Sequence, residues 1–141
     1  MEGRQSKNQV NIKVVWVNGT FDVLHLGHIK LLEFAKGLGD FLVVGIDQDH
    51  RVRELKGHPR PINACQNRVE FLKSIKYVDT VVTFGTDAEL INHIRTIKPQ
   101  VMVVGSDYID KKIIGSEWAG EVKYFDRIGD LSTTKILKSH E

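Results

Sequence analysis

Several features that define other classes of protein are scarce in this sequence. A single cysteine, Cys65, excludes an intrachain disulfide and is compatible with a reducing compartment. No apolar stretch approaches the ~20 residues that a transmembrane helix needs. The formal net charge of the 141 residues is only +2, which is too small to indicate nucleic acid as a bulk electrostatic partner. We therefore expect neither a membrane nor a nucleic-acid partner.

The beginning of the chain is polar. Met1 to Gln9 lacks the apolar core of a secretory signal, so we expect no such signal and a cytoplasmic location. Residues 1–10 are predicted to be a flexible tail. Residues 11–141 are predicted to be a single domain, which is long enough to bury a sizeable core.

Apolar runs and helical patterns alternate along the rest of the chain. The runs predict strands at 12–17, 41–46, 78–84, 101–104 and 121–125. Helices are predicted at 29–38, from an Asn63 cap to Ile75, from an Asp87 cap to Ile97, and from Leu131 onward. The basic segment from His50 to Arg60 is predicted to be a loop, because Gly57, Pro59 and Pro61 interrupt it.

This alternation predicts an α/β fold, namely a single Rossmann-like domain with a parallel sheet of about five strands and helices on both faces. Ligands of such sheets bind at the carboxyl ends of the strands, near the point where the strand order reverses. We therefore expect the functional residues at or just after the strand ends.

The segment from Gly19 to His28 directly follows the first predicted strand. It predicts a tight glycine turn that leads into a helix, and the opening of that helix contains His25 and His28. Backbone N–H groups at a helix N-terminus and the helix dipole both favour bound anions. Two imidazoles at this place can donate hydrogen bonds to phosphate oxygens. The segment therefore predicts phosphate chemistry.

The segment has three other interpretations. A dinucleotide-binding turn needs three glycines between strand and helix, and residues 18–27 contain only Gly19 and Gly27, which excludes it. A zinc site could use His25 and His28, but the sequence does not clearly supply a third ligand. The two histidines could also be structural or solvated side chains. The last two interpretations stay open at this point.

The same segment resembles a known enzyme family. Gly19-Thr20-Phe21-Asp22, followed by His25-Leu26-Gly27-His28, is similar to the signature of the cytidylyltransferase-like nucleotidylyltransferases. In that superfamily the HxGH motif binds the triphosphate of an NTP. The similarity spans nearly the whole chain and includes two groups of relatives, the adenylyltransferase domain of bacterial ADP-heptose synthases and glycerol-3-phosphate cytidylyltransferase.

The two groups are similar to different parts of the chain. The middle, with Leu55-Lys56-Gly57, Arg60-Pro61 and Gly105-Ser106-Asp107-Tyr108, resembles the ADP-heptose synthases. Both ends, with Gly-Thr-Phe-Asp at the front and Arg127 and Ser132-Thr133-Thr134 at the back, resemble glycerol-3-phosphate cytidylyltransferase. The chain departs from the first group at Val104, where a lysine is usual. It departs from the second after Arg127, where a threonine is missing and Asp130 is inserted.

The resemblance implies an enzyme that transfers NMP from an NTP, ATP or CTP, to a phosphorylated sugar or polyol and releases pyrophosphate. The implied catalytic residues are His25, His28 and Lys56; the nucleotide-binding residues are Gly19, Thr20, Phe21, Arg127, Ser132, Thr133 and Thr134; the acceptor-binding residues are Asp22, Arg68 and Asp107. No metal ligand is expected from the protein, and Mg²⁺ is expected to rest mostly on substrate oxygens. A homodimer is expected, because homodimers are the commonest soluble oligomers and these relatives are often dimeric.

The substrate implied first is heptose 1-phosphate with ATP, since the similarity to ADP-heptose synthases accounts for more segments. The alternative is a glycerol-3-phosphate cytidylyltransferase that makes CDP-glycerol. A hypothesis from another class is a nucleotide-binding module without catalysis. The intact histidines and the intact lysine segment favour an enzyme over that module.

Overall fold

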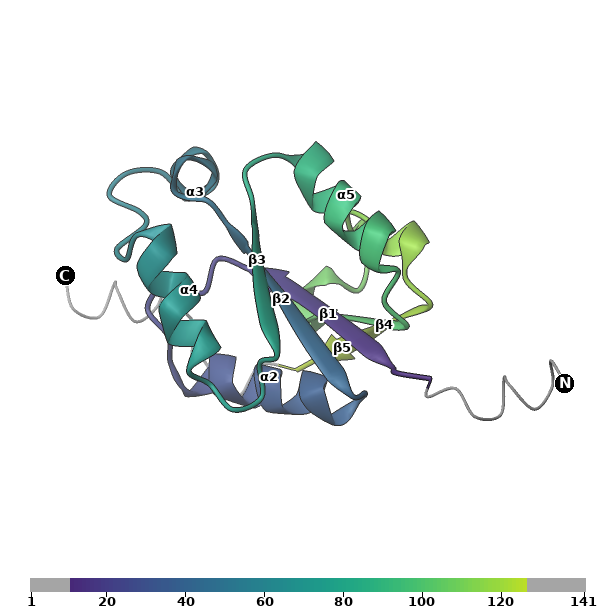
Figure 1. Cartoon of the computed structure of the whole chain (residues 1–141). Coiled ribbons are helices and arrows are strands. Elements are labelled where there is room, and N and C mark those ends of the chain that lie inside the picture. The colour runs from purple at the N-terminus through teal and green to yellow at the C-terminus, as the bar shows by residue number, and fades with distance from the viewer. Residues whose placement is uncertain (1–10, 127–141) are drawn as a thin grey trace, which may run out of the picture.

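Five short strands pair side by side in the computed structural model, which describes residues 11–126 (Figure 1). They are β1 (Val14–Gly19), β2 (Phe41–Asp47), β3 (Thr80–Phe84), β4 (Val101–Gly105) and β5 (Glu121–Phe125). Their order in the sheet is β3-β2-β1-β4-β5, and every neighbouring pair is parallel. The predicted α/β fold with a five-stranded parallel sheet is confirmed.

Four α-helices connect the strands: α2 (Leu26–Gly37), α3 (Asp49–Lys56), α4 (Cys65–Lys73) and α5 (Asp87–Ile97). Two single-turn 3₁₀ helices, η1 (Ser106–Tyr108) and η2 (Ser116–Trp118), lie between β4 and β5. Figure 1 shows α2 and α4 on one side of the sheet and α5 on the other. Helices thus cover both faces, as predicted.

The core follows from the alternation of side chains along each buried strand. Val15 and Val17 of β1 pack in one cluster with Leu32 of α2 and Leu72 of α4. Trp16 points to the opposite face, where it packs in a second cluster with residues of α5. Because both faces are covered there, the central strands β1, β2 and β4 are apolar at nearly every position.

The central strand β1 pairs with β2 on one side and β4 on the other. The chain winds from β1 through β2 to β3 in one direction and then returns to place β4 and β5 in the other. The strand order therefore reverses between β1 and β4. In open parallel sheets the carboxyl ends of two such strands border the binding crevice.

Three predicted local features need correction. The segment predicted as a loop from His50 to Arg60 begins as α3, because its helix breakers come only after Lys56; Gly57, with φ +80°, ends that helix. The N-cap of α4 is Ala64 instead of Asn63. The N-cap of α5 is Thr86 instead of Asp87, and the Thr86 side chain accepts from the backbone N–H of Glu89. Thr86 and Asp87 are both good caps, so tertiary context decided between them.

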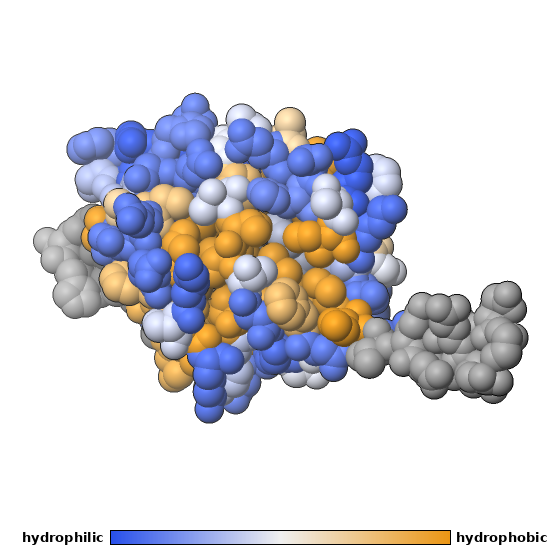
Figure 2. All heavy atoms as spheres, in the orientation of Figure 1, coloured by the Kyte–Doolittle hydropathy of each residue, from blue (hydrophilic) through white to orange (hydrophobic). Residues whose placement is uncertain are grey.

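The face that Figure 2 shows is hydrophilic around its edge, with apolar side chains gathered in its middle. Residues 11–126 contain no helix that is both long and apolar enough to cross a membrane. The predicted tail of residues 1–10 and the helix predicted from Leu131 onward lie outside the described residues.

Candidate active site

A cavity of about 590 Å³ opens at the carboxyl ends of β1 and β4, where the strand order reverses. Its size falls within the range of small-molecule sites. The residues that line it come from β1 and the turn after it, from α2, α3 and α5, from the ends of β2, β4 and β5, and from the segments after α3 and β4. They are Val17, Asn18, Gly19, Thr20, Phe21, His25, Gly27, His28, Leu31, Asp47, Arg51, Leu55, Lys56, Arg60, Leu90, Val103, Val104, Gly105, Tyr108, Lys112, Ile113, Ile114 and Phe125.

His25 and His28 form a stacked pair at the start of α2, with ring centroids 4.0 Å apart. His25 is the N-cap, and its Nδ1 accepts from the backbone N–H of Gly27 at 3.0 Å. The Nδ1 of His28 accepts from the backbone N–H of His25 at 3.2 Å. Because both Nδ1 atoms accept, the neutral rings carry their proton on Nε2. The backbone thus orients two imidazole donors at a positive helix end.

The turn before α2 is strained. Phe21 and Val23 have φ values of 51° and 62°, a region that a β-branched residue rarely adopts. Between them, the Asp22 carboxylate accepts from the backbone N–H groups of Ile62 at 2.5 Å and Asn63 at 2.8 Å. Phe21 in turn packs against the His28 ring, with centroids 5.2 Å apart. Strain of this kind persists only where surrounding contacts impose it, and it is common at functional sites.

Asp47, at the end of β2, connects the turn to α3. Its carboxylate accepts from the Thr20 hydroxyl at 3.2 Å and from Nε of Arg51 at 2.8 Å. Burial by itself lowers the pKa of Arg51, but its hydrogen bonds to Asp87 and Asp47 raise that pKa above its ordinary value. Arg51 therefore stays charged at the cavity wall while it braces Asp47.

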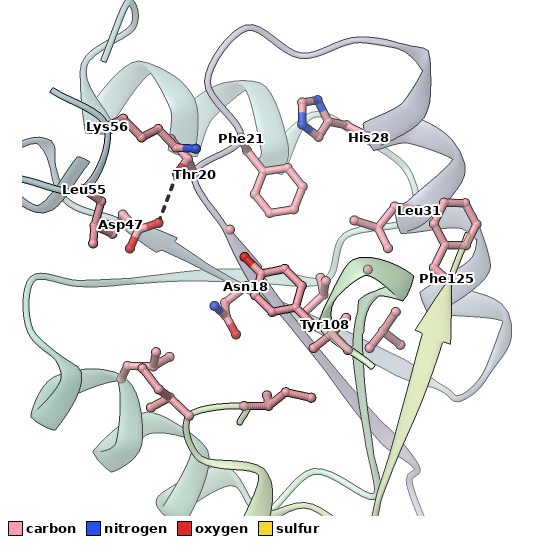
Figure 3. Close-up of a pocket in the computed structure, with 18 of the residues that line it drawn as sticks. Asn18, Thr20, Phe21, His28, Leu31, Asp47, Leu55, Lys56, Tyr108 and Phe125 are labelled. Atoms are coloured by element: carbon pink, nitrogen blue, oxygen red, sulfur yellow. Dashed lines mark hydrogen bonds between the residues drawn. The ribbon is translucent and has the colours of Figure 1, made fainter. Parts of the chain in front are cut away.

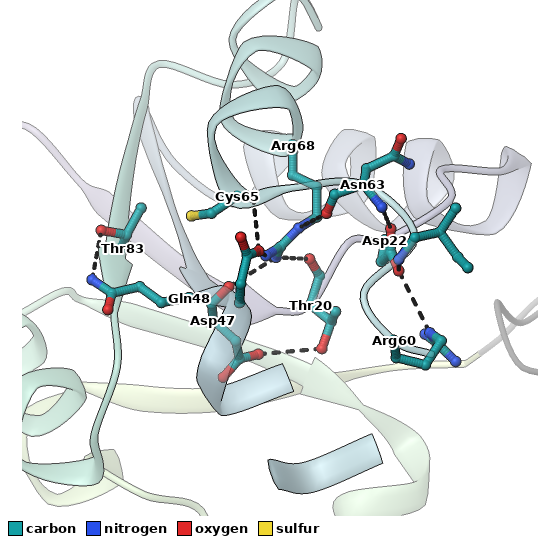
Figure 4. A network of polar contacts seen from close by, with 11 residues as sticks. Thr20, Asp22, Asp47, Gln48, Arg60, Asn63, Cys65, Arg68 and Thr83 are labelled. Carbon is teal, nitrogen blue, oxygen red and sulfur yellow. Dashed lines mark hydrogen bonds and ion pairs between the residues drawn. The ribbon is translucent and has the colours of Figure 1, made fainter. Parts of the chain in front are cut away.

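Arg68, which is predicted to contact the acceptor, lies inside the protein. The side chain is fully buried in α4, and Figure 4 shows its guanidinium inside a polar network. It donates to the carbonyl oxygens of Asn63, Thr20 and Asp47 and to the Asp49 carboxylate, at 2.8–3.0 Å. In this structure the guanidinium has no exposed surface and holds the strand ends in place, so the predicted acceptor contact of Arg68 stays a prediction without a direct path to the cavity.

The other predicted site residues divide into three sets. Gly19, Thr20, Phe21, His25, His28 and Lys56 all line the cavity, and Figure 3 shows Lys56, Phe21 and His28 around it. Asp22 is only 1% exposed and faces the loop at 60–63, while Asp107 is exposed on η1 beside the lining residue Tyr108. Arg127, Ser132, Thr133 and Thr134 lie outside the described residues.

Several polar lining residues were missed from sequence: Asn18, Arg51, Arg60 and Lys112. Asn18 had a usable signal, because polar residues at the end of an apolar strand lie at the binding edge of a parallel sheet. Asp47, which directly follows the second predicted strand, was expected at that edge and lines the cavity. Arg51 and Arg60 belong to the basic segment, but the alternation pattern does not tell which of its cations face the cavity. Nothing in the sequence singles out Lys112.

Metal-ligating side chains are not clustered in the described part of the chain. No three His, Cys, Asp or Glu side chains there are grouped so that they could hold a metal ion. The Asp47 carboxylate at the cavity wall already bonds Thr20 and Arg51. The described residues therefore offer no dedicated metal site.

A comparison with known sequence families agrees with the motif at the start of α2. The sequence pattern of the family described as cytidylyltransferase-like matches residues 16–139. The chain belongs to the cytidylyltransferase-like family. This confirms the resemblance predicted from the Gly-Thr-Phe-Asp turn and the HxGH motif, and the match covers every element that borders the cavity.

Curated relatives in this family are larger proteins. The chain is 48% identical over 124 residues to the bifunctional protein HldE of Campylobacter fetus, covering 88% of this chain and 27% of that protein. It is 45% identical over 127 residues to HldE of Helicobacter hepaticus, covering 90% of this chain and 26% of that protein. The chain thus spans about a quarter of the length of these relatives.

Solved structures show the same fold. The lipopolysaccharide core biosynthesis protein of Thermoplasma volcanium superposes with a TM-score of 0.66 and 27% identity, covering 86% of this chain and all of that one. Pantothenate synthetase from Thermus thermophilus superposes with a TM-score of 0.64 at 15% identity, covering 95% of this chain and 64% of that one. At that identity the second likeness is one of fold alone.

Proposed function

We propose that the protein is a nucleotidylyltransferase that transfers NMP from an NTP to a sugar phosphate and releases pyrophosphate. The observation that carries the proposal is the stacked pair of His25 and His28 at the N-terminus of α2, inside the cavity that Lys56 also lines. A helix N-terminus, two oriented imidazole donors and a lysine together suit a polyphosphate. Membership in the cytidylyltransferase-like family supports the same chemistry.

The proposed reaction is one in-line displacement. A phosphate oxygen of the acceptor attacks the α-phosphorus of the NTP, a new P–O bond forms there, and the bond from the α-phosphorus to the β-phosphate oxygen breaks. The bonding electrons leave with pyrophosphate, so no covalent enzyme intermediate is needed. Catalysis then consists of positioning and charge stabilisation.

Each residue has a proposed role in that step. His25 and His28 stabilise charge on the α-phosphate and on the departing pyrophosphate, and Lys56 neutralises the β- and γ-phosphates. The backbone at Gly19, Thr20 and Phe21 receives the phosphates. Arg127 and Ser132 to Thr134 are proposed to bind the nucleotide from another side, and Asp107 to contact the acceptor. Asp22 and Arg68 act through the turn and strand ends that they hold.

Mg²⁺ is part of the proposal only as an ion that the triphosphate binds. Because residues 11–126 contain no group of three metal-ligating side chains, the ion would rest on phosphate oxygens and water, as Mg²⁺ commonly does. No step is assigned to it here.

Heptose 1-phosphate with ATP is the proposed substrate pair. The resemblance of the Leu55-Lys56-Gly57 and Arg60-Pro61 segments to ADP-heptose synthases supports it, as does the identity with the HldE proteins. A lipopolysaccharide core contains sugars, so the likeness to the Thermoplasma protein agrees with a sugar-phosphate acceptor. The Gly-Thr-Phe-Asp turn favours the second candidate, glycerol-3-phosphate cytidylyltransferase. Either reaction places the enzyme where NTPs are abundant, so we propose a cytoplasmic location.

A pyrophosphate-release assay tests the proposal. ATP and CTP are each combined with heptose 1-phosphate, glycerol 3-phosphate and other phosphorylated polyols. Turnover with ATP and heptose 1-phosphate is expected, and turnover with CTP and glycerol 3-phosphate would support the alternative. NTP binding without pyrophosphate release from any pair would instead support a binding module without catalysis.

The histidine pair is tested separately with His28→Ala. Loss of one preorganised donor is expected to lower kcat by about 10²–10³-fold, with the melting temperature measured in parallel to show that the variant is folded. His50→Ala is the matched control, since His50 is an exposed histidine outside the cavity lining. Near wild-type kcat in folded His28→Ala would contradict the mechanism.

A further inference from the structure

Arg60 is a buried cation at the cavity wall. It lies in the segment between α3 and α4, and its side chain is 10% exposed. It lines the same cavity as Lys56, His25 and His28. The sequence indicated it as one of several cations in the basic segment and as part of the Arg60-Pro61 pair that resembles the ADP-heptose synthases, but assigned it no role.

The hydrogen bonds of Arg60 are incomplete. Its Nε lies 3.5 Å from the Asp22 carboxylate, which is an ion-pair distance, but Nε and Nη2 make no hydrogen bond with any residue in the described part of the chain. Asp22 meanwhile accepts two short bonds from the backbone of Ile62 and Asn63. A guanidinium has five N–H donors, and burying them without acceptors costs free energy.

Two other arginines at this end of the sheet are arranged differently. Arg68 donates to four oxygen atoms, and Arg51 donates to the carboxylates of Asp47 and Asp87. Both are held by the protein alone. Arg60 is instead held beside Asp22 by charge, and residues 11–126 supply no hydrogen-bond acceptor to its Nε and Nη2.

The chemistry of a guanidinium indicates which hydrogen-bond acceptor would complete the bonds of Arg60. A guanidinium is a rigid fork that matches two oxygens of a phosphate, and a charge-assisted pair of this kind is strong where water is scarce. Lys56 ends α3, and Arg60 follows it by four residues, so one short segment brings both cations to the cavity. Two neighbouring cations suit the part of an NTP with the highest charge, its β- and γ-phosphates.

We propose that Arg60 binds the β- and γ-phosphates of the NTP and holds the pyrophosphate that leaves, while Asp22 positions its guanidinium. This rests on the proposed nucleotidyl transfer. It also changes the role of Asp22, which acts through Arg60 and the 60–63 loop instead of contacting the acceptor.

The test uses inorganic pyrophosphate as the probe, with binding measured by titration calorimetry on the full chain. Arg60→Met is expected to weaken pyrophosphate binding by about 10–100-fold, the range set by one or two charge-assisted hydrogen bonds. Arg60→Lys is expected to recover part of the loss, because it keeps the charge but not the fork. Arg53→Met is the control, since Arg53 is an exposed arginine of α3 outside the cavity lining; its binding should stay within about twofold of wild type.

Kinetics separate the phosphates from the acceptor. In Arg60→Lys the KM for the NTP should rise while the KM for the acceptor stays unchanged. A rise in the acceptor KM with unchanged pyrophosphate binding would overturn the proposal and assign Arg60 to the acceptor. If Arg60→Met melts far below wild type, the Arg60→Lys variant decides the test. A second readout is the NMR resonance of the Arg60 Nε–H in folded wild type, which should shift when pyrophosphate is added.

Failure of this proposal is distinguishable from failure of the proposed function. Wild-type affinity for pyrophosphate in both Arg60 variants, with NTP turnover intact in wild type, would overturn only the role of Arg60. Wild-type protein that neither binds pyrophosphate nor turns over any NTP would overturn the nucleotidyl transfer itself, and the role of Arg60 with it.

Discussion

Arg68 supports the site from within the protein. Its guanidinium connects the turn at Thr20 with the end of β2 at Asp47, two segments that lie far apart in the sequence. Arg68→Met is expected to destabilise the fold by about 3–5 kcal/mol, because it removes the buried guanidinium that bonds three carbonyl oxygens and pairs with Asp49. Denaturant unfolding measures the change.

The control for Arg68→Met is Arg95→Met, which removes an exposed arginine of α5. It should stay within about 0.5 kcal/mol of wild type. If Arg68→Met were equally mild while the KM for the acceptor rose, Arg68 would be a substrate contact after all, and its placement inside the network would be the wrong account.

Cys65 shows how burial decides reactivity at the scale of one residue. The thiol is half-buried at the start of α4, and burial raises its pKa. A thiol with a raised pKa forms little thiolate at neutral pH, so it is a poor nucleophile. Cys65 instead packs, partly buried, against the hydrophobic core.

At the scale of elements, strand β2 has no room for a side chain at Gly45. A Cβ built on Gly45 would lie 2.6 Å from Cζ2 of Trp16 and 3.2 Å from Cε1 of Phe84, and both rings are fully buried. Gly45→Ala is therefore expected to lower the free energy of unfolding by about 1–3 kcal/mol through overpacking. Gly37→Ala, at the end of α2, is the control, because a Cβ there meets nothing within 4 Å. A neutral Gly45→Ala would show that the Trp16 ring can move.

The contact between α2 and the start of β3 depends on charge. Lys36 of α2 bonds the Asp79 carboxylate, which also accepts from the backbone N–H of Leu42. Burial by itself raises the pKa of Asp79, but the hydrogen bond from Lys36 and that from Leu42 lower it below its ordinary value. A lowered carboxyl pKa stabilises the fold above the unfolded pKa of about 4, and this contribution is lost as the pH falls through the folded pKa.

Asp79→Asn tests that contact without changing its shape. The difference in free energy of unfolding between wild type and Asp79→Asn should be constant near neutral pH and should shrink as the pH is lowered below about 4. Asp110→Asn, which removes an exposed carboxylate after η1, serves as the control. A difference that grew on acidification would contradict the assigned direction.

At the scale of the whole molecule, the homodimer remains a prediction. Homodimers are the commonest soluble oligomers, and apolar surface such as that at the centre of Figure 2 is often where copies meet. Light scattering at several protein concentrations should give twice the mass of one chain. A single-chain mass at every concentration would contradict the prediction.

The sequence by itself determined the five strands and three of the four described α-helices, and it indicated the chemistry of the motif. Continuous apolar runs predicted the strands, because a strand covered on both faces has no polar side to show. His25 and His28 were found because their place in a strand–turn–helix segment depends only on neighbours along the chain. The sequence predicted a loop in place of α3, because the segment contains the helix breakers Gly57, Pro59 and Pro61. All three lie after Lys56, the last residue of the helix, so they do not interrupt it.

Only the tertiary structure decided which cations serve the fold and which line the cavity. Arg51, Arg60 and Arg68 look alike in sequence, but each has an oxygen partner on a segment that is distant in the sequence and close in the fold. Arg68 meets Thr20 across 48 residues, and no local pattern encodes such a contact. Hydrogen bonding then separates the two buried arginines, since the well-bonded Arg68 supports the fold, whereas Arg60, with two donors unbonded among the described residues, is the one proposed to bind phosphate.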